Sequence, residues 1–429
     1  MKQKKQIKTI NILHIDSYDK YGGAQKSTVN SLKAIKLMLK SLQPNSNLDL
    51  SAVKKNAFLT EETDLYNNCG GSKHQRSAHT QNSKYNFNFY VIHNNNKIYE
   101  EELNNLNIPN FSIKMKNFGD IIAIAKISKF LIKYKINIVI FHSSRDHMLG
   151  GIACFLSGRK IIKILTRHVA YNVSFLKGFL IYHLLTDHYI AISKYIKNIL
   201  IDDLKINPDK ITVIYDIRFS DETMGTDAAG ITEVYVKNEL NIPEEMKIIS
   251  IIGRLSNEKG HKTFLNAARL IIKKRKDIKF MIVGDGDLFE NIKEFINDNN
   301  LSDYIIMTGF KKNIERYIEA SDLIIVPSGL EGLGGIIVES CMQKKPVIAS
   351  NVGGIPEIID NKLTGILFEK DNFHELAEKI LNIIDNKQML NKLGNNCYKK
   401  ISEEFNPYKL AEENLNLYLR LLKLESFNR

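Results

Sequence analysis

The sequence has few cysteines and lacks any long apolar run. Its four cysteines are scattered along the chain, at Cys69, Cys154, Cys341 and Cys397. Because this spacing is unlike that of a small secreted protein, we expect no disulfide framework and a reducing compartment. No uninterrupted apolar stretch reaches the roughly 20 residues that a membrane-spanning helix requires. The first residues combine charges with only a short apolar run, so we expect no signal peptide and a cytoplasmic protein.

The chain is basic, with 60 Lys and Arg residues against 48 Asp and Glu residues and a net charge of +12. Such a surplus predicts an anionic partner. Nucleic acid is not expected, because no binding motif with interleaved aromatic residues is present. An anionic inner-membrane leaflet could instead contact the lysine-rich start, 1–8, or the stretch 121–135, where lysines alternate with isoleucines. For the stretch 121–135 we favour the alternative of a solvated amphipathic helix that covers a sheet.

With 429 residues, of which 44% are hydrophobic, the chain is too long for one ordinary core and suits two domains of about 200 residues each. Short apolar segments separated by helical stretches are typical of doubly wound parallel sheets. The segments of the first half are 10–15, 136–141, 161–165, 189–193 and 211–214. We predict an N-terminal domain over 1–216, a C-terminal domain over 217–405 and a final amphipathic helix within 406–429.

One stretch, 41–84, is polar and has little apolar periodicity, so we expect a mobile insertion. It is either a cover for a second substrate or simply a tolerated loop. Its Cys69, His74 and His79 do not form a convincing zinc set, because a fourth ligand and a paired Cys-x2-Cys spacing are missing.

A glycine-rich loop follows the apolar strand predicted over 323–326 and leads into a helix. Glu331 on this loop and Glu339 on the helix can each accept hydrogen bonds from sugar hydroxyls. Between them, the amides of Gly335 and Ile336 lie at a helix N-terminus, which favours a diphosphate. Two hydroxylated rings joined by a diphosphate describe a nucleotide sugar. A tight turn with two incidental glutamates is the simpler alternative.

A second loop, 253–260, follows the strand predicted over 248–252 and carries Arg254 and Lys259. Open α/β sheets bind ligands at the carboxyl ends of their strands, so both cations would meet the same diphosphate. Near the start of the chain, Gly22 and Gly23 follow another predicted strand and would let the backbone approach a ligand closely.

These loops resemble those of glycosyltransferase family 4, the glycosyl transferases group 1, whose members are retaining enzymes of the GT-B fold. The resemblance covers 248–368 and includes the spacing of seven residues between Glu331 and Glu339, together with 284–286, 346–349 and 353–357. It implies an α/β protein with two Rossmann-like domains that face each other across a cleft. The C-terminal helix is expected to cross back to the N-terminal domain.

The resemblance also implies roles for the residues of the C-terminal half. Arg254 and Lys259 would bind the donor diphosphate and stabilise its charge as it leaves. Glu331 would hold the transferred sugar and Glu339 the ribose. The base is expected to contact the backbone near Phe310 and Lys311. None of these roles requires a cofactor beyond the donor itself.

In the N-terminal half, the Gly22–Gly23 loop is similar to the family loop that faces the donor phosphates, although Gln25 stands where an acidic residue is usual. His168, which follows the strand predicted over 161–165, is expected to lie near the transferred sugar or the acceptor. A packed histidine bound to backbone is the alternative. After 211–214 the chain reads 215–219 without the Asn-Gly-Val-Asp motif of many relatives, so contacts of that motif are not expected.

The segment Asp285-Gly286-Asp287 matches the Asp-x-Asp signature of metal-dependent glycosyltransferases. Its context favours a turn, with Asp287 as the cap of a following helix. Because Arg254 and Lys259 already supply positive charge, we predict that no metal is bound.

The sequence thus predicts a retaining, metal-independent glycosyltransferase that uses a nucleotide-diphosphate sugar. Its acceptor would be a glycan or lipid-linked glycan, in the synthesis of a bacterial capsule, lipopolysaccharide or exopolysaccharide. The alternative from another class is a catalytically weak homologue that serves as a binding or accessory subunit. A nucleotide-sugar epimerase or a sugar phosphorylase could share the architecture but fits the motifs less well.

Overall fold

The computed structural model describes residues 8–18, 22–41, 85–168, 182–215 and 229–427. The basic start over 1–7, nearly all of the insertion expected over 41–84, and most of the predicted domain junction lie outside these ranges.

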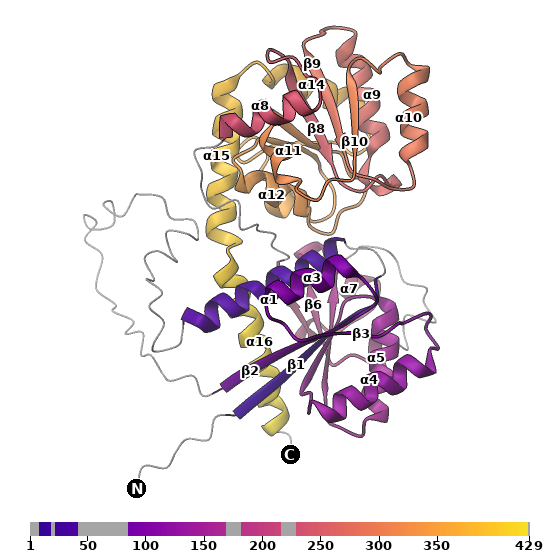
Figure 1. Ribbon diagram of the computed structural model, residues 1–429. Coiled ribbons are helices and arrows are strands. Elements are labelled where there is room, and N and C mark those ends of the chain that lie inside the picture. The colour runs from indigo at the N-terminus through magenta and orange to yellow at the C-terminus, as the bar shows by residue number, and fades with distance from the viewer. Residues whose placement is uncertain (1–7, 19–21, 42–84, 169–181, 216–228, 428–429) are drawn as a thin grey trace, which may run out of the picture.

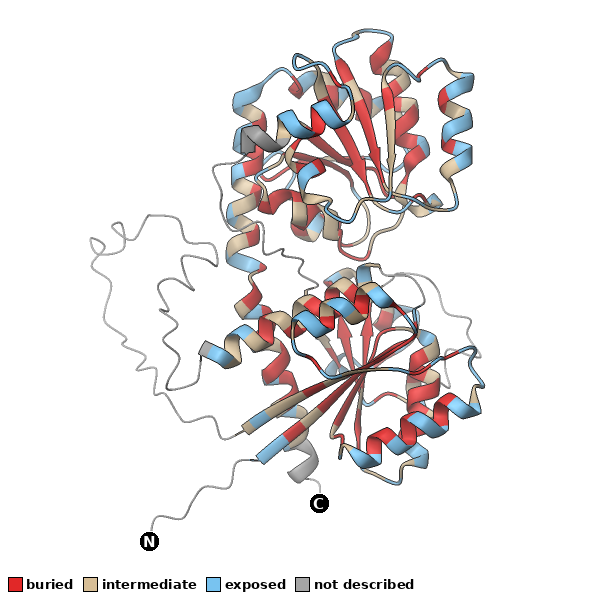
Figure 2. Ribbon diagram, viewed as in Figure 1, coloured by how far each residue is buried: buried red, intermediate tan, exposed pale blue. Residues whose placement is uncertain are grey.

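The N-terminal domain contains a parallel seven-stranded sheet with the strand order β3-β2-β1-β4-β5-β6-β7 (Figure 1). Most of its central residues are apolar and buried on both sides, as expected for parallel strands covered by helices on both faces (Figure 2). The strands are β1 Lys8–Asp16, β2 Tyr85–His93, β3 Asn110–Ser112, β4 Ile138–Phe141, β5 Ile162–Arg167, β6 His188–Ala191 and β7 Ile211–Val213.

Polar residues before the helices of this domain fix where several of them begin. The side chains of Asn96, Asp120, Ser143 and Ser193 each accept a hydrogen bond from a backbone N–H in the first turn of the helix that follows. The helices are α1 Gly23–Ser41, α3 Lys97–Asn105, α4 Ile121–Lys133, α5 Ser144–Leu156 and α7 Lys194–Asp202. Each connects two parallel strands, so the carboxyl ends of the strands share one edge of the sheet.

The C-terminal domain repeats this plan with a parallel six-stranded sheet in the order β10-β9-β8-β11-β12-β13. Its strands are β8 Lys247–Ile252, β9 Ile278–Val283, β10 Ile305–Gly309, β11 Leu323–Val326, β12 Val347–Ser350 and β13 Ile366–Phe368. Its helices are α8 Ala229–Glu239, α9 His261–Ile272, α10 Phe289–Asp298, α11 Glu315–Glu319, α12 Gly335–Met342, α13 Ile355–Ile358, α14 Phe373–Ile383 and α15 Lys387–Glu404.

The last helix, α16 Pro407–Phe427, follows α15 and runs down to the N-terminal domain, where it packs against α1 (Figure 1). Leu415 and Tyr418, on the apolar face that the sequence predicts, are buried there. The two doubly wound sheets and the helix that crosses back are the predicted fold. No helix of the described ranges is long and apolar enough to cross a bilayer.

The cysteine prediction is wrong at one pair. Cys341 of α12 forms a disulfide with Cys397 of α15, and their Cα atoms lie 5.3 Å apart. The pair is separated by 56 residues in sequence, and only the packing of α12 against α15 brings the two thiols together. The cysteines therefore do not indicate a reducing compartment.

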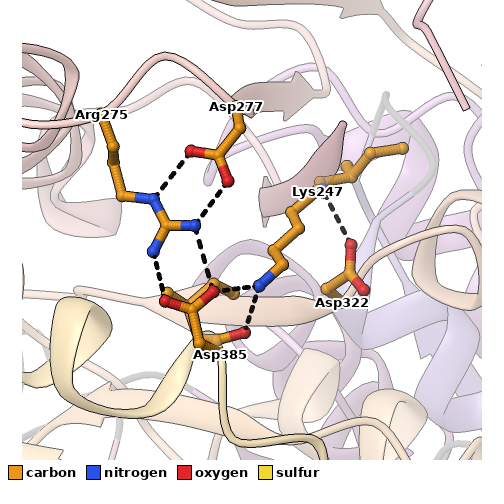
Figure 3. Close-up of polar contacts among 7 residues, drawn as sticks. Lys247, Arg275, Asp277, Asp322 and Asp385 are labelled. Atoms are coloured by element: carbon orange, nitrogen blue, oxygen red, sulfur yellow. Dashed lines mark hydrogen bonds and ion pairs between the residues drawn. The ribbon is translucent and has the colours of Figure 1, made fainter. Parts of the chain in front are cut away.

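An ion network lies at the starts of β8 and β9 in the C-terminal domain (Figure 3). Arg275 donates to both oxygens of Asp277, at 2.8 Å and 2.5 Å, and to both oxygens of Asp385, at 2.7 Å and 3.1 Å. Lys247, the first residue of β8, also pairs with Asp385. The hydrogen bonds from Arg275, and then those from Lys247, hold the pKa of Asp385 below its usual range.

A lowered carboxyl pKa stabilises the folded state above the pKa of the unfolded chain, about 4 for Asp, and this contribution is lost as the pH falls below it. Asp385 is largely exposed, so solvent screens the network. We expect Asp385→Asn to lower the free energy of unfolding by about 1 kcal/mol or less at pH 7. The deficit should shrink at pH 3.5, as measured by urea denaturation.

The control is Asp298→Asn, which removes the same charge from an exposed helix end of this domain. It should leave stability nearly unchanged at both pH values. An equal deficit of Asp385→Asn at pH 7 and pH 3.5 would contradict the ionic explanation.

Candidate active site between the two domains

The two domains meet where strands of both sheets end. Ser193, directly after β6 and its short loop, donates a hydrogen bond from Oγ to the carbonyl oxygen of Gly332 at 2.7 Å. A Cβ atom added to Gly332 would lie 2.7 Å from the carbonyl oxygen of His168, which follows β5. Only glycine therefore fits at this contact, and the glycine-rich loop of the C-terminal domain touches the edge of the N-terminal sheet.

Glu357 reinforces this contact with a charge. Its carboxylate accepts hydrogen bonds from the backbone N–H of Lys194, at 2.9 Å, and of Tyr195, at 2.8 Å. Both groups belong to the first turn of α7, where unpaired N–H groups and the helix dipole favour an anion. The hydroxyl of Tyr215 donates to the same carboxylate at 3.0 Å. A side chain of one domain thus caps a helix of the other.

Within the C-terminal domain, the loops after β8 and β11 pack backbone against backbone. The N–H of Gly329 donates to the carbonyl oxygen of Glu258 at 2.8 Å. Gly260 has a φ of 73°, and a Cβ atom there would lie 1.8 Å from the carbonyl oxygen of Pro327. This close approach requires glycine and brings the side chains of the two loops together.

Lys259 and Glu331, which the sequence places on separate loops, are in contact. Nζ of Lys259 lies 2.6 Å from Oε2 of Glu331, and the hydroxyl of Ser328 donates to the same oxygen at 3.2 Å. The side chains are 29% and 13% exposed, so the pair is partly shielded from water. The site therefore holds a cation and an anion that already neutralise each other.

Arg254 is more exposed to solvent than Lys259, with 69% of its side chain accessible. Its guanidinium donates to Oε1 of Glu258 at 2.8 Å. Burial works to raise the pKa of Glu258, but hydrogen bonds, among them the one from Arg254, outweigh burial and lower it to about 2. Because the pair is solvated, Arg254 can turn towards a ligand at little cost.

The predicted binding residues of the donor domain occupy the adjoining loops. α12 begins at Gly335, after Gly334 with a φ of 106°, so the N–H groups of Gly335 and Ile336 open the helix. Glu339 lies one turn further along and is half-buried. Phe310, after β10, is 63% exposed.

Lys311, the neighbour of Phe310, has its side chain directed to another partner. Nζ lies 2.7 Å from Oε1 of Glu239 on α8 and 5.3 Å from the ring centroid of Tyr317. The hydrogen bond from Lys311 is the main cause that lowers the pKa of Glu239. Only the backbone of Lys311 is thus left for the expected contact with a base.

Gln25 stands where the family resemblance led us to expect an acidic residue, and its contacts account for the amide. Its Nε2 donates to both oxygens of Asp16, at 2.8 Å and 3.0 Å, and its Oε1 accepts from the N–H of Gly22 at 2.9 Å. Both side chains are buried, and burial raises the pKa of Asp16. A second carboxylate here would repel the first, whereas the amide holds Asp16 and the loop at Gly22 and Gly23.

His168 is not isolated. Its Nε2 lies 3.2 Å from Nδ1 of His142, which follows β4, and Nε2 of His142 lies 3.0 Å from Nδ1 of His14 on β1. Neither His142 nor His14 was predicted from the sequence. His142 follows a strand as His168 does, and this shared position was the signal available in the sequence.

The Asp-x-Asp segment does not cap a helix. α10 begins at Phe289 after Leu288, without a side-chain cap, so the role predicted for Asp287 is wrong. Asp285 and Asp287 are exposed, and Asp285 accepts a hydrogen bond from the N–H of Gly286 at 2.8 Å. Among the described residues, no group of three or more His, Cys, Asp or Glu side chains is placed to hold a metal ion.

Two parallel-sheet domains, a crossing helix and glycine-rich loops at the shared edge define the GT-B class of glycosyltransferases. Residues 236–400 match the family described as glycosyl transferases group 1, and residues 83–216 match glycosyltransferase family 4. A glycosyltransferase of Methanocaldococcus jannaschii is 31% identical over 308 residues, which cover 70% of this chain and 80% of that protein. The chain belongs to this family of GT-B glycosyltransferases.

Other relatives indicate the range of the family. The UDP-Gal:alpha-D-GlcNAc-diphosphoundecaprenol alpha-1,3-galactosyltransferase of Escherichia coli is 28% identical, over 73% of this chain and 83% of that protein. A capsular polysaccharide biosynthesis glycosyltransferase of Staphylococcus aureus, CapM, is 26% identical, over 71% of this chain and 82% of that protein.

Solved structures agree on the fold. A glycosyltransferase of Rickettsia africae superposes with a TM-score of 0.75 at 22% identity, over 97% of this chain and 99% of that one. HepE of Anabaena, solved in complex with UDP-glucose, gives a TM-score of 0.75 at 18% identity, over 96% of this chain and 100% of that one.

The contact of Lys259 with Glu331 predicts opposite effects of removing each partner. Lys259→Met should weaken binding of a nucleoside diphosphate about tenfold to a hundredfold, because a charge-assisted hydrogen bond is lost. Glu331→Gln should bind the same nucleotide as tightly as wild type or more tightly, since Lys259 loses its competing anion. Calorimetric titration with UDP, GDP and ADP measures both affinities.

The matched control is Lys293→Met, which removes a lysine from an exposed position of α10. Its nucleotide affinity should equal that of wild type. Parallel losses in Lys259→Met and Glu331→Gln would instead mean that the ion pair supports the loops and does not contact the diphosphate.

Proposed function

We propose that the protein is a retaining, metal-independent glycosyltransferase that moves a sugar from a nucleotide-diphosphate donor to a glycan or lipid-linked glycan. The observation that carries the proposal is the contact between Lys259 and Glu331 on two interlocked glycine-rich loops. A diphosphate that approaches Lys259 releases Glu331 to accept hydrogen bonds from sugar hydroxyls. The pair therefore offers Lys259 to the diphosphate and Glu331 to the sugar of the donor.

Each proposed group acts at a stated point of the transfer. The bond between the anomeric carbon and the diphosphate oxygen breaks, and the developing charge is stabilised by Lys259, by Arg254 and by the first N–H groups of α12. The acceptor hydroxyl forms the new bond on the same face and passes its proton to the departing phosphate oxygen. Glu331, held by Lys259 and Ser328, serves binding and not nucleophilic attack. Glu339 binds the ribose.

The relatives support the choice of substrates. The galactosyltransferase of Escherichia coli uses UDP-Gal, by its name, and forms an alpha linkage on a diphosphoundecaprenol acceptor. Because the sugar of UDP-galactose is itself alpha-linked, that reaction retains configuration. CapM is named for capsular polysaccharide synthesis. We therefore place the acceptor in the synthesis of a bacterial surface polysaccharide and take UDP-hexoses as the first donors to test.

The proposal predicts transfer that survives removal of metal. With UDP-glucose or UDP-galactose and a GlcNAc-diphospholipid acceptor, product should form equally with and without EDTA, and its anomeric proton coupling in NMR should be that of an alpha glycoside. A beta product, or loss of turnover in EDTA that Mg²⁺ or Mn²⁺ restores, would overturn retention or metal independence respectively. Absence of transfer and of nucleotide binding, across UDP, GDP, ADP and CMP sugars, would favour an accessory subunit.

We also propose that the protein contacts the anionic membrane leaflet that holds such an acceptor. Along α4, Ile121 and Ile122 are 78% and 69% exposed. Lys126, Lys129 and Lys133 are exposed on the same face of the helix. The opposite face of α4 packs on the domain, as the solvated-helix alternative requires. Exposed isoleucines beside lysines suit the boundary between acyl chains and anionic headgroups better than bulk water.

This contact predicts salt-sensitive binding to anionic vesicles in a sedimentation assay. The paired substitution Lys126→Ser and Lys129→Ser should weaken binding to phosphatidylglycerol vesicles by roughly tenfold or more, since each lysine near such a surface contributes about 1 kcal/mol. Leu363→Ser, at an exposed apolar position of the C-terminal domain, is the control and should bind as wild type does. Equal binding to neutral and anionic vesicles would contradict the electrostatic part.

A further inference from the structure

A disulfide is attached to the same short helix that opens the proposed donor site. Cys341, near the end of α12, is bonded to Cys397 of α15, and both residues are fully buried. Cys341 lies two residues after Glu339, which places the two side chains about 200° apart on a helix of 3.6 residues per turn. The helix therefore presents Glu339 on one side and is bonded to α15 on the other.

The backbones of these two segments also lie close together. A Cβ atom added to Gly394, one turn before Cys397 on α15, would lie 1.9 Å from the carbonyl oxygen of Lys344, just after α12. The helices therefore cannot move closer at this point. With eight residues, α12 is too short to be stable alone, and its position depends on what it packs against. The attachment to α15 thus helps to fix where α12 lies.

Reduction of the bond changes the room that the two sulfur atoms need. Non-bonded sulfur atoms cannot approach as closely as bonded ones, and the tightly packed surroundings leave them no free space. The helix α15 has 18 residues and continues into α16 on the other domain, whereas α12 lies between two loops (Figure 1). We therefore expect α12 to shift. Because it is only about 12 Å long, a shift at Cys341 also moves its first turn.

We propose that the disulfide between Cys341 and Cys397 is a redox-sensitive switch of donor affinity, which is high while the bond is intact and lower once a dithiol has reduced it. This inference rests on the proposed function, in which Glu339 and the first N–H groups of α12 bind the donor. In the reduced protein, binding must also bring α12 into place, and this ordering lowers the affinity. We expect a loss of about fivefold to tenfold, at the lower end of the range for coupled sites.

The chemical step is a thiol–disulfide exchange. One thiolate of the dithiol attacks a sulfur atom of the bond and expels the other as a thiolate, which takes up a proton. The second thiol of the reductant then displaces the first protein sulfur. Two protein thiols and one cyclic disulfide of the reductant result, and two electrons pass to the protein. Because both cysteines are buried, the reductant reaches them only when α12 and α15 open locally.

The coupling must act in both directions. If reduction weakens nucleotide binding by a given factor, the nucleotide must favour the oxidised protein by the same factor. A fivefold to tenfold effect corresponds to a midpoint potential about 20 to 30 mV more negative in saturating nucleotide, because a tenfold change is about 30 mV for a two-electron couple. This shift can be measured in dithiothreitol redox buffers without any variant.

The test compares the oxidised full chain with the chain reduced by dithiothreitol, with the thiols counted by mass spectrometry after alkylation. Calorimetric titration with UDP, GDP and ADP identifies the nucleotide that binds and gives its affinity in each state. The reduced protein should bind it about fivefold to tenfold more weakly, and reoxidation should restore the affinity.

Two variants assign the effect to this pair. The double substitution Cys341→Ala and Cys397→Ala should bind the nucleotide equally with and without dithiothreitol. The matched control is Cys154→Ala, which removes a buried free cysteine from α5 of the other domain. It should respond to the reductant as the wild type does.

Hydrogen exchange measured by mass spectrometry tests the attachment of α12 without any nucleotide. Amides of 335–342 should exchange faster in the reduced protein. Amides of α10, which lies on the other side of the same domain, should exchange equally in both states (Figure 1).

Several outcomes would overturn the proposal. Two free thiols at Cys341 and Cys397 after treatment with an oxidant reject it at once. Equal nucleotide affinity in the two states rejects the switch and leaves the proposed function intact. A reduced protein that loses its circular dichroism spectrum shows that the bond supports folding and is not a switch. If α12 exchanges faster on reduction but no nucleotide binds in either state, the attachment stands, whereas the proposed function and the effect on donor affinity fail.

Discussion

The structure depends on one contact between its domains, the carboxylate of Glu357 at the first turn of α7. Helix N-termini leave N–H groups unpaired, and here those of Lys194 and Tyr195 find their acceptor on the other domain. The hydrogen bond from Ser193 to Gly332 lies beside it. Because these bonds fix the loop after β11 against the N-terminal sheet, residues of both domains face one site.

That site is built by backbone more than by side chains. A Cβ atom at Gly260 would meet the carbonyl oxygen of Pro327 at 1.8 Å, and one at Gly353 would meet that of Glu331 at 2.0 Å. Loops that approach this closely cannot shift independently, so a ligand meets a prearranged set of groups. The prearrangement explains why Lys259 and Glu331, 72 residues apart, meet at 2.6 Å.

The sequence predicts those parts that local patterns determine. β11 was predicted with its observed bounds because Leu323 to Val326 is a short apolar run before a glycine-rich turn. β2 was not predicted, because it follows a long polar stretch. Nor could local patterns find Glu357, whose partners on α7 are 163 and 162 residues away. His14 was missed for the same reason, since it lies 128 residues from His142, the histidine that it contacts.

The pairing of the site's charges before the donor arrives has a consequence for catalysis. A partly shielded lysine without an anion would be costly, so Glu331 stabilises the empty site. A diphosphate that takes the place of this anion leaves Glu331 without its cation, and the sugar hydroxyls of an intact donor compensate this loss. Both new contacts form together when the intact donor binds. A nucleotide without its sugar contacts Lys259 but leaves Glu331 without a partner for its charge. An ion pair at this position therefore favours the intact donor over the released nucleotide, which is the direction that turnover requires.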